Sequence, residues 1–376
     1  MSEKVLILGA SQTKLIKALK NKGYYTIAVS NVVTEKIDAL DELVQISTTN
    51  FPKIKELIST QNIIRAFTMG SDIAQQTLCK LAEFFGWDNY PSYRLFDQLH
   101  QKNQVRQKLI DNNLSSIPLI CASTFDNKLF DFSRYEAFVV KPVDGYGSKG
   151  ISIVHEYNDL EKCFIKAKAF SSAKSVLVEP LIEGAHFTLE FFVHDGSVSI
   201  LLATAKENNK HLVPYLFKSI KRSPFNNMVK KFATALELEN GFYNVDLLQT
   251  NDKLELIDIA PRLGGSFLVQ MYKQVFGEGI APKYIDYTIS GTEPKQMVPS
   301  KIVGLYVLHA DKKGELTKLN VPQNYPLLTS EVPDLPKAVE SFTESRFQFG
   351  YLMYDLPKKL SIESLDENFS EILTIN

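Results

Sequence analysis

The chain has 376 residues, enough for roughly two or three domains of ordinary size. Hydrophobic residues make up 44% and charged residues 23% of the sequence, which is the composition of an ordinary globular protein. The formal net charge of −1 gives no support for a nucleic-acid partner or for binding to a membrane surface. The apolar runs are too short to span a membrane, and the three cysteines lack metal-ligand spacing. These features lead us to expect a cytoplasmic protein.

Residues 1–95 alternate strand signals with helix signals. An apolar run at Val5–Leu8 precedes Gly9–Ser11, a helical pattern follows around Leu15–Leu19, and Tyr25–Val29 is a second apolar run. Strand–helix–strand order is typical of a parallel sheet covered by helices. We therefore predict a small Rossmann-like α/β domain at the N-terminus.

After residue 95 the pattern mixes hairpins with helices and is α+β in character. Helices are predicted over residues 101–114 and 160–169. Strands are predicted at Ala137–Lys141, Ile151–Val154, Val176–Glu179, Phe187–Val193, Val198–Ala203, Gly241–Gln249 and Lys253–Ile259, the last two joined by a turn at residues 250–252. The predicted parts are a small lobe at residues 96–180, a large lobe at 181–300 and a small, mostly β unit at 301–376.

The strongest chemical signal is a glycine-rich run in the predicted small lobe. Lys141 ends a strand, and Gly145, Gly147, Ser148 and Gly150 follow within a few residues. Glycines let backbone N–H groups approach phosphate oxygens, and the lysine supplies a positive charge. The run is not a Walker A loop, because no GK[ST] sequence opens a helix after it. A phosphate-binding loop is one interpretation, and a glycine-rich hairpin with a solvated lysine is the other.

Two aspartates and an arginine form the second signal. Asp246 and Asp258 each lie among apolar strand residues, where a carboxylate is costly to bury unless it is paired or holds a metal. Side chains on paired strands can converge on one face, and two carboxylates with nucleotide phosphates suit Mg²⁺. Arg262 precedes two glycines and suits a substrate carboxylate or phosphate. Solvent-facing acids and a surface salt bridge are the alternatives.

A third signal is a strand that ends near Glu179, followed by a short polar linker and a strand that returns after His186. Such a crossover can present backbone groups to an adenine ring and a carboxylate to a ribose. A lone histidine in this place is more often a packed or surface residue.

Together and in this order, these segments resemble the ATP-grasp superfamily, and in particular its carboxylate–amine ligase branch. Residues 1–95 look like the family's Rossmann-like pre-ATP-grasp domain, and the following α+β lobes look like the two that hold ATP between them. The resemblance implies ATP and Mg²⁺ as cofactors, with Mn²⁺ as an alternative metal.

The resemblance also assigns nucleotide-binding residues. Lys102 matches the family's first phosphate lysine, although Gln101 replaces the usual aspartate before it. Lys141 matches the second lysine and is an expected catalytic residue, with Gly145, Gly147 and Ser148 in the loop that follows.

The family's adenine-binding hinge resembles the segment that ends at Leu181, with Glu179 in its acidic position. His186 stands where a ribose-binding glutamate is usual, as it does in biotin carboxylases. These three residues are therefore expected to contact the nucleotide.

The metal and substrate residues follow from the same resemblance. Asp246 and Asp258 match two metal carboxylates that are usually glutamates, and Ala260 replaces a frequent metal-ligand asparagine. The segment ending at Arg262 is similar to that of purine-pathway carboxylases, and its extension to Ser266 looks more like that of L-amino-acid ligases. Arg262 is expected to be catalytic, because it would orient the substrate carboxylate.

The implied function is an ADP-forming ligase that makes an acyl phosphate from a small carboxylic or amino acid and passes it to an amine. Its partners would be these small molecules, and dimers are common among similar ligases. The alternatives are a bicarbonate-activating carboxylase, a non-catalytic ATP-binding regulator, and a dinucleotide-dependent oxidoreductase, which lacks its GxGxxG pattern here. Loops at residues 203–222 and 264–275 are expected to shape the substrate pocket.

Overall fold

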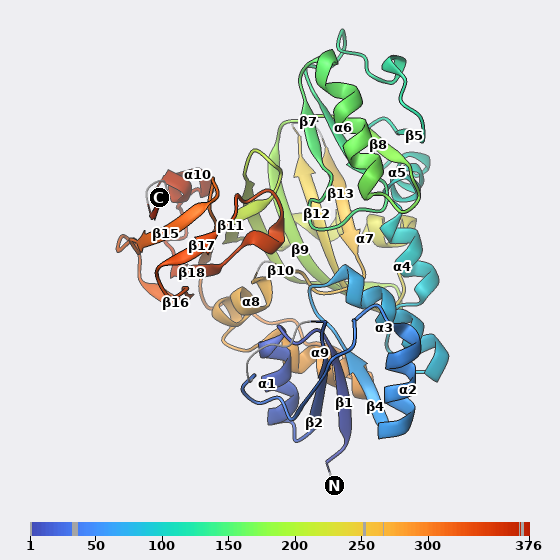
Figure 1. The fold of residues 1–376 in the computed structure, drawn as a ribbon, viewed down its shortest axis with the longest axis vertical. Helices are drawn as coiled ribbons and strands as arrows, with labels where there is room; N and C mark the ends of the chain where they lie inside the picture. The colour runs from blue at the N-terminus through green and yellow to red at the C-terminus, as the bar shows by residue number, and fades with distance from the viewer. Residues whose placement is uncertain (1, 32–36, 251–252, 266, 368, 370–371) are drawn as a thin grey trace.

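The computed structural model describes residues 2–31, 37–250, 253–265, 267–367, 369 and 372–376. The predicted turn residues 251–252 and Ser266 therefore lie outside the described residues. Figure 1 shows the N-terminal part at the bottom, a small lobe at the top, a long sheet between them, and the C-terminal strands to the left. None of the described helices combines the length and the apolar character that a membrane span requires.

The N-terminal part is a parallel sheet with the strand order β3-β2-β1-β4. Its strands are β1 (Lys4–Leu8), β2 (Tyr25–Val29), β3 (Glu42–Val44) and β4 (Ile63–Phe67), and its helices are α1 (Thr13–Asn21), α2 (Phe51–Gln61) and α3 (Asp72–Phe85). Val5 and Ile7 join one apolar core with α1, whereas Leu6 and Leu8 join another with α2 and α3. The alternation follows from the two-residue period of a strand, and both faces of the sheet are covered.

A helix from late in the chain completes this N-terminal part. Helix α9 (Ile280–Ser290) packs beside α1, and its Tyr284 and Ile285 share a core with Val5 and Ile7. Residues 1–95 thus fold against a segment that lies almost 200 residues further along the chain.

The small lobe is an antiparallel sheet with the order β5-β8-β6-β7. Helices α4 (Tyr93–His100) and α5 (Lys102–Asp111) lead into it from the N-terminal part. Its strands are β5 (Ile120–Ala122), β6 (Phe138–Pro142), β7 (Ser152–Val154) and β8 (Val176–Pro180), with a 3₁₀ turn at Asn127–Leu129. Helix α6 (Tyr157–Phe170) packs Leu160 and Phe164 on one face of this sheet.

The large sheet has eight strands in the order β13-β12-β9-β10-β11-β14-β18-β16. They are β9 (Ala185–His194), β10 (Ser197–Asn208), β11 (Pro214–Ser219), β12 (Gly241–Gln249), β13 (Leu254–Ala260), β14 (Val303–Leu308), β16 (Leu327–Glu331) and β18 (Gly350–Asp355). Helices α7 (Asn226–Ala235) and α8 (Leu268–Phe276) pack beside it, and 3₁₀ turns lie at Ser223–Phe225 and Ser345–Phe347. Strands from beyond residue 300 thus continue the sheet that carries β12 and β13.

A second, three-stranded sheet, in the order β17-β15-β19, lies at the C-terminal side. It comprises β15 (Gly314–Leu319), β17 (Lys337–Val339) and β19 (Leu373–Ile375), and the short helix α10 (Ile362–Glu367) precedes its last strand.

The predicted combination of an N-terminal α/β part with α+β lobes is confirmed. The two predicted loops are corrected. Residues 203–222 contain the end of β10 and all of β11, and residues 264–275 contain most of α8. Helix α8 buries Leu268, Met271, Tyr272 and Val275, a spacing that is helical, so its signal was present in the sequence.

Candidate active site

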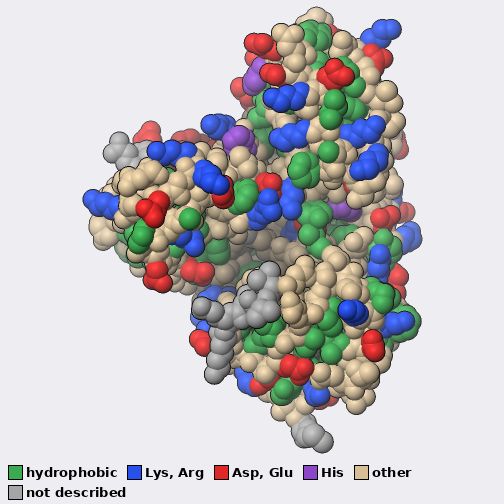
Figure 2. Space-filling model, viewed as in Figure 1, with side chains coloured by type: hydrophobic (Ala, Val, Ile, Leu, Met, Phe, Trp, Pro, Cys, Tyr) green, Lys and Arg blue, Asp and Glu red, His purple; other side chains and the backbone are tan. Residues whose placement is uncertain are grey.

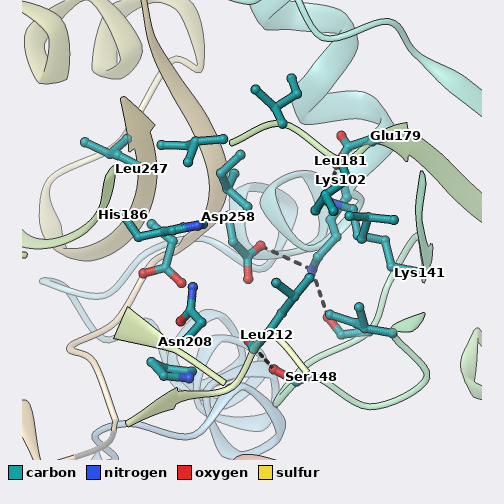
Figure 3. Close-up of a pocket in the computed structure, with 18 of the residues that line it drawn as sticks. Lys102, Lys141, Ser148, Glu179, Leu181, His186, Asn208, Leu212, Leu247 and Asp258 are labelled. Carbon is teal, nitrogen blue, oxygen red and sulfur yellow. Dashed lines mark hydrogen bonds and ion pairs between the residues drawn. The ribbon is translucent and has the colours of Figure 1, made fainter. Parts of the chain in front are cut away.

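A cleft between the small lobe and the large sheet collects the residues predicted to bind the nucleotide and the metal (Figure 3). Figure 2 shows the hollow where the parts of the molecule meet, with Lys and Arg side chains gathered in it. The predicted residues that line the cleft are Lys102, Lys141, Gly145, Gly147, Ser148, Glu179, Leu181, His186, Asp246 and Asp258. These residues lie up to 156 positions apart in the sequence, and the fold brings them to one cavity.

The two aspartates lie directly opposite each other. Asp246 on β12 and Asp258 on β13 are cross-strand partners, and both line the cleft. Burial raises the pKa of the Asp246 carboxyl, but the Lys206 ammonium outweighs it, so the net direction is downward and the carboxylate is ionised. Asn244 on β12 lies opposite Ala260 on β13, so β12 carries an amide side chain at this position.

This donor set fits a divalent cation that is shared with phosphates. Two carboxylates face one cavity, and carboxylate oxygens are the ligands that Mg²⁺ prefers. In the parts of the chain that the structure describes, no group of three or more His, Cys, Asp and Glu side chains gathers as a metal cage. Asp246 and Asp258 would therefore hold a metal together with a nucleotide and water.

Lys102 links the glycine-rich loop to Asp258 across the cleft. Its Nζ donates to the carbonyl oxygen of Gly145 at 2.8 Å and lies 3.2 Å from Oδ1 of Asp258, as Figure 3 shows. A Cβ at Gly145 would lie 2.9 Å from Cγ of Pro142, so the backbone needs glycine there. A second contact holds the loop at the cleft, because Ser148 Oγ donates to the carbonyl oxygen of Leu212 at 3.4 Å.

Tyr146 joins the same loop to helix α4. Its ring stacks on that of His100, with the centroids 6.2 Å apart, and His100 stacks in turn on Phe96. Burial and the nearby Lys102 both lower the pKa of His100, so the imidazole is neutral near pH 7 and suits a stack.

Lys141 and Glu179 form a buried ion pair at the wall of the cleft. Lys141 Nζ lies 2.5 Å from Oε2 of Glu179, and Arg106 lies 2.9 Å from Oε1 of the same carboxylate. Burial raises the pKa of Glu179, and the two cations more than reverse this, so the carboxylate is ionised. The Glu179 carboxylate is therefore committed to two cations, and its contact with a nucleotide stays a prediction.

Arg106 continues into a polar network that the sequence did not reveal. It donates to Ser115 Oγ at 2.9 Å, and both Ser115 and Ser116 donate to Glu255 on β13. The network joins α5, the small lobe and the large sheet. Its only signal in the sequence was Glu255 itself, a charged residue between two apolar strand residues.

Leu181 lies in the segment predicted to be the adenine-binding hinge, and it can offer the cleft its side chain but not its backbone N–H. The Leu181 N–H donates to the carbonyl oxygen of Ala137 at 2.8 Å, and its side chain lines the cleft. Ile182 lines the same cleft, and its N–H has no hydrogen-bond partner among the described residues. His186 lies opposite Lys206 on the neighbouring strand, and burial followed by that lysine lowers the pKa of its imidazole.

A second cavity adjoins the first. The two share residues 146–149 of the glycine-rich loop, together with Lys206, Pro214, Asp246 and Asp258. The N-terminal part adds Ser11 and residues 70–73, and the C-terminal part adds Arg346 and Gln348. The two aspartates therefore stand in a wall that both cavities share.

Arg262 lines this second cavity and not the first, and it is neither solvated nor free. Its Nε and Nη2 each lie 2.8 Å from a carboxylate oxygen of Asp72, and Nη1 donates to the Leu263 carbonyl at 3.1 Å. Only 13% of the Arg262 side chain is exposed. Burial raises the pKa of Asp72, and the guanidinium outweighs this and lowers it. The alternative of a surface salt bridge therefore does not hold, because the pair of Arg262 with Asp72 is mostly buried.

Two further charged residues were not among the predicted site residues. Lys206 on β10 is only 5% exposed, lines both cavities, and places its Nζ 2.7 Å from Oδ1 of Asp246. Glu190 on β9 accepts hydrogen bonds from Asn244 and from the backbone N–H of Gly264, and burial raises its pKa to about 8. For Glu190 the available signal was a charged residue inside an apolar strand, whereas Lys206 lies at the polar end of β10 and gave no such signal.

The comparisons agree with this geometry. Residues 99–266 match the family model described as an ATP-grasp domain. The L-amino acid ligase of Bacillus licheniformis has a TM-score of 0.82 at 17% identity, covering 100% of this chain and 98% of that one. The biotin carboxylase domain of the Hydrogenobacter thermophilus 2-oxoglutarate carboxylase, in complex with MgADP and bicarbonate, has a TM-score of 0.77 at 15% identity, covering 100% and 91%.

Two other relatives extend the comparison. Phosphoribosylglycinamide synthetase from Anaerococcus prevotii has a TM-score of 0.71 at 17% identity, covering 100% of both chains. An uncharacterized protein of Methanocaldococcus jannaschii is 22% identical over 285 residues, which cover 70% of this chain and 69% of that protein. Residues 99–266 match an ATP-grasp domain, so the resemblance to the ATP-grasp superfamily is confirmed for that part of the chain, and the solved structures share the fold of the whole. At these identities the structural likeness establishes the fold and leaves the substrates open.

Proposed function

We propose that the protein is an ADP-forming carboxylate–amine ligase that works through an acyl phosphate. One observation carries the proposal: Asp246 and Asp258 face each other on paired strands, in the wall shared by two cavities. A nucleotide in the first cavity would bring its phosphates to this wall, and an acid in the second would reach it from the other side. The glycine-rich loop borders both cavities, which suits a lid over the reacting atoms.

In the first cavity, apolar side chains such as Leu181 and Leu248 suit an adenine ring, and the Ile182 N–H suits its edge. Lys102, Lys141 and the backbone N–H groups of the loop would neutralise the phosphates. Asp246 and Asp258 would hold Mg²⁺, which supplies further charge neutralisation at the phosphates when it is bound.

The chemistry needs two transfers. A carboxylate oxygen bonds to the γ-phosphorus while the bond to the β–γ bridging oxygen breaks, and ADP leaves. The amine nitrogen then bonds to the carbonyl carbon, the bond to the phosphate oxygen breaks, and the amine proton leaves with the phosphate. Neither step requires a covalent bond to a side chain, so the residues act by positioning and charge stabilisation.

Lys141 and Arg262 are the catalytic residues of this proposal. Lys141 would face the phosphates from the floor of the first cavity. Arg262 has five N–H donors, and Asp72 and Leu263 occupy three of them. The remaining two would orient the substrate carboxylate, with Asp72 holding the guanidinium in place.

The substrate class is proposed from the fold. The likeness to an L-amino acid ligase over the whole chain favours an amino acid as the acid, the amine or both. A bicarbonate-activating carboxylase is the second candidate, because the similar 2-oxoglutarate carboxylase domain was solved with bicarbonate. A regulator that binds ATP without turnover is the third, since both metal carboxylates are aspartates and Ala260 replaces an amide.

A coupled assay of ADP release tests the proposal. Amino acids would be supplied singly and in pairs, with bicarbonate as a separate arm and wild-type protein beside Asp258→Asn. ADP release that needs an acid and an amine together supports the ligase. Release that needs bicarbonate favours the carboxylase. Nucleotide binding without turnover in every arm favours the regulator and contradicts the ligase.

A further inference from the structure

Both aspartates proposed to hold the metal are already paired with a lysine. Lys206 Nζ lies 2.7 Å from Oδ1 of Asp246, and Lys102 Nζ lies 3.2 Å from Oδ1 of Asp258. Both lysines also line the nucleotide cavity. Resting on the proposed function, we propose that Lys102 and Lys206 are exchangeable counter-ions. They hold the aspartates until a triphosphate draws the lysines away, and only then do the aspartates accept a divalent cation.

The Lys206–Asp246 pair is the tighter of the two. Only 5% of the Lys206 side chain is exposed, and Asp246 also accepts a hydrogen bond from Thr188 Oγ1 at 2.6 Å. A divalent cation that displaced Lys206 without a replacement partner would leave a buried ammonium unpaired beside a second positive charge. Desolvation and repulsion both oppose that state. Metal binding alone is therefore expected to be weak.

In the described part of the chain, Lys206 has no second carboxylate within ion-pair distance. His186 lies opposite it on β9, and burial lowers the pKa of that imidazole, so the ring is neutral at pH 7. Phe217 lies opposite it on β11, and among the described residues Asp246 is the only acid within ion-pair distance of its Nζ. An anionic ligand in the cleft is thus the partner that could take Lys206 from Asp246.

The Lys102–Asp258 pair links the same exchange to the glycine-rich loop. Asp258 is 47% exposed, so this pair is looser, but Lys102 Nζ also donates to the Gly145 carbonyl. A phosphate that draws Lys102 away from Asp258 would meet the loop that borders both cavities. Nucleotide, metal and loop would therefore respond together, and the affinities of metal and nucleotide would rise by the same factor.

The test measures Mn²⁺ binding without turnover, by the electron paramagnetic resonance signal of free Mn²⁺. Wild type and Lys206→Met would be titrated without nucleotide and again with a non-hydrolysable ATP analogue. Lys206→Met is expected to bind Mn²⁺ about tenfold more tightly than wild type without nucleotide, because Asp246 has lost its counter-ion. The gain in Mn²⁺ affinity on adding the analogue should be correspondingly smaller in the variant.

Lys149→Met is the matched control. Lys149 lines both cavities as Lys206 does, but its Nζ makes no ion pair with the carboxylates that the structure describes. The control removes the same charge, so a general electrostatic effect would raise Mn²⁺ affinity equally in both variants. The proposal expects less than about a threefold change for Lys149→Met. Asp246→Asn in the Lys206→Met background should return Mn²⁺ binding to the weak wild-type level.

Several results would overturn the proposal. These are unchanged Mn²⁺ affinity in Lys206→Met, an equal gain in Lys149→Met, or wild-type Mn²⁺ binding that is as tight without nucleotide as with it. If circular dichroism finds Lys206→Met unfolded, Lys206→Gln takes its place with the same expected gain. Failure of the ligase proposal is separate, because it shows as absent ADP release in a protein whose Mn²⁺ response is intact.

Discussion

At the scale of single residues, Arg106 links two buried glutamates. It bridges Glu179 and Ser115 and lies 3.8 Å from Glu255, and it is buried. Arg106→Met would leave the two glutamates with fewer partners, so we expect a loss of about 3–5 kcal/mol in the free energy of unfolding. Urea denaturation measures it.

Arg94→Met is the control for that variant. Arg94 is 79% exposed and lies 3.8 Å from Glu239, so a change of less than about 1 kcal/mol is expected. Equal stability of both variants would mean that the buried network contributes nothing to stability.

Glu190 predicts a pH dependence of stability. Its pKa in the folded protein is about 8, above the ordinary value of 4.5, because burial disfavours the carboxylate. The folded state therefore binds more protons than the unfolded state between pH 4.5 and about 8. The stabilising contribution is present below pH 4.5 and is lost as the pH rises to about 8. Glu190→Gln should remove this slope from the unfolding free energy measured across that range, and an unchanged slope would contradict the assignment.

Asp258 predicts an effect on activity with little effect on stability. It is half exposed and its lysine contact is loose, so Asp258→Asn should leave the melting temperature within about 2 °C of wild type. The same variant should lower the rate of ADP release by about three orders of magnitude, because it removes a proposed metal ligand. Normal turnover with full substrates would show that the metal lies elsewhere.

At this scale the sequence predicted those site residues that are charged although their neighbours in the sequence are apolar. Lys141, Asp246 and Asp258 are charged residues at or within apolar strands, and all three line the cleft. The partner of Arg262 could not be predicted, because Asp72 lies 190 positions away and belongs to another part of the fold. Pairings of that kind depend on tertiary packing.

At the scale of elements, the glycine-rich loop depends on close packing as well as on φ. Gly150 has φ +75°, and a Cβ there would lie 2.9 Å from Cβ of Phe170, whereas Gly196 has φ +74° and nothing within 4 Å. Both Gly→Ala variants carry the same backbone strain. Gly150→Ala should be less stable than Gly196→Ala by about 1–3 kcal/mol, because only it adds a clash.

Thermal unfolding compares the two glycine variants, and titration with an ATP analogue checks the loop. Weaker analogue binding is expected for Gly150→Ala alone. Equal stability and equal affinity in the two variants would show that the loop tolerates a side chain at residue 150.

Elements were predicted best where periodicity was strong. The predicted strand Gly241–Gln249 has the bounds of β12, and Lys253–Ile259 differs from β13 by one residue at each end. Strand β11 was missed because Pro214 opens it after a loop, and a proline there argues locally against a strand. Its pairing with β14, almost 90 residues later, supplies what local sequence lacks.

At the scale of the whole molecule, the N-terminal α/β part depends on a helix from late in the chain. Helix α9 covers one face of its sheet through Tyr284 and Ile285, and the Asp72–Arg262 pair joins it to the second cavity. Removing residues 1–95 would expose this apolar face of α9. We expect the shortened protein to lose its cooperative thermal transition or to aggregate.

The full-length chain is the control for this deletion. A deletion variant that melted cooperatively and bound an ATP analogue as the full chain does would contradict the shared core. The domain boundary near residue 95 is a proposal that this comparison also tests.

The most direct measurement is a crystal structure with an ATP analogue and Mn²⁺, whose anomalous scattering locates the metal. The proposed function predicts a Mn²⁺ peak between Asp246 and Asp258, with the base against Leu181 and the phosphates beneath the glycine-rich loop. A nucleotide bound outside this cleft, or a metal that touches neither aspartate, would contradict it.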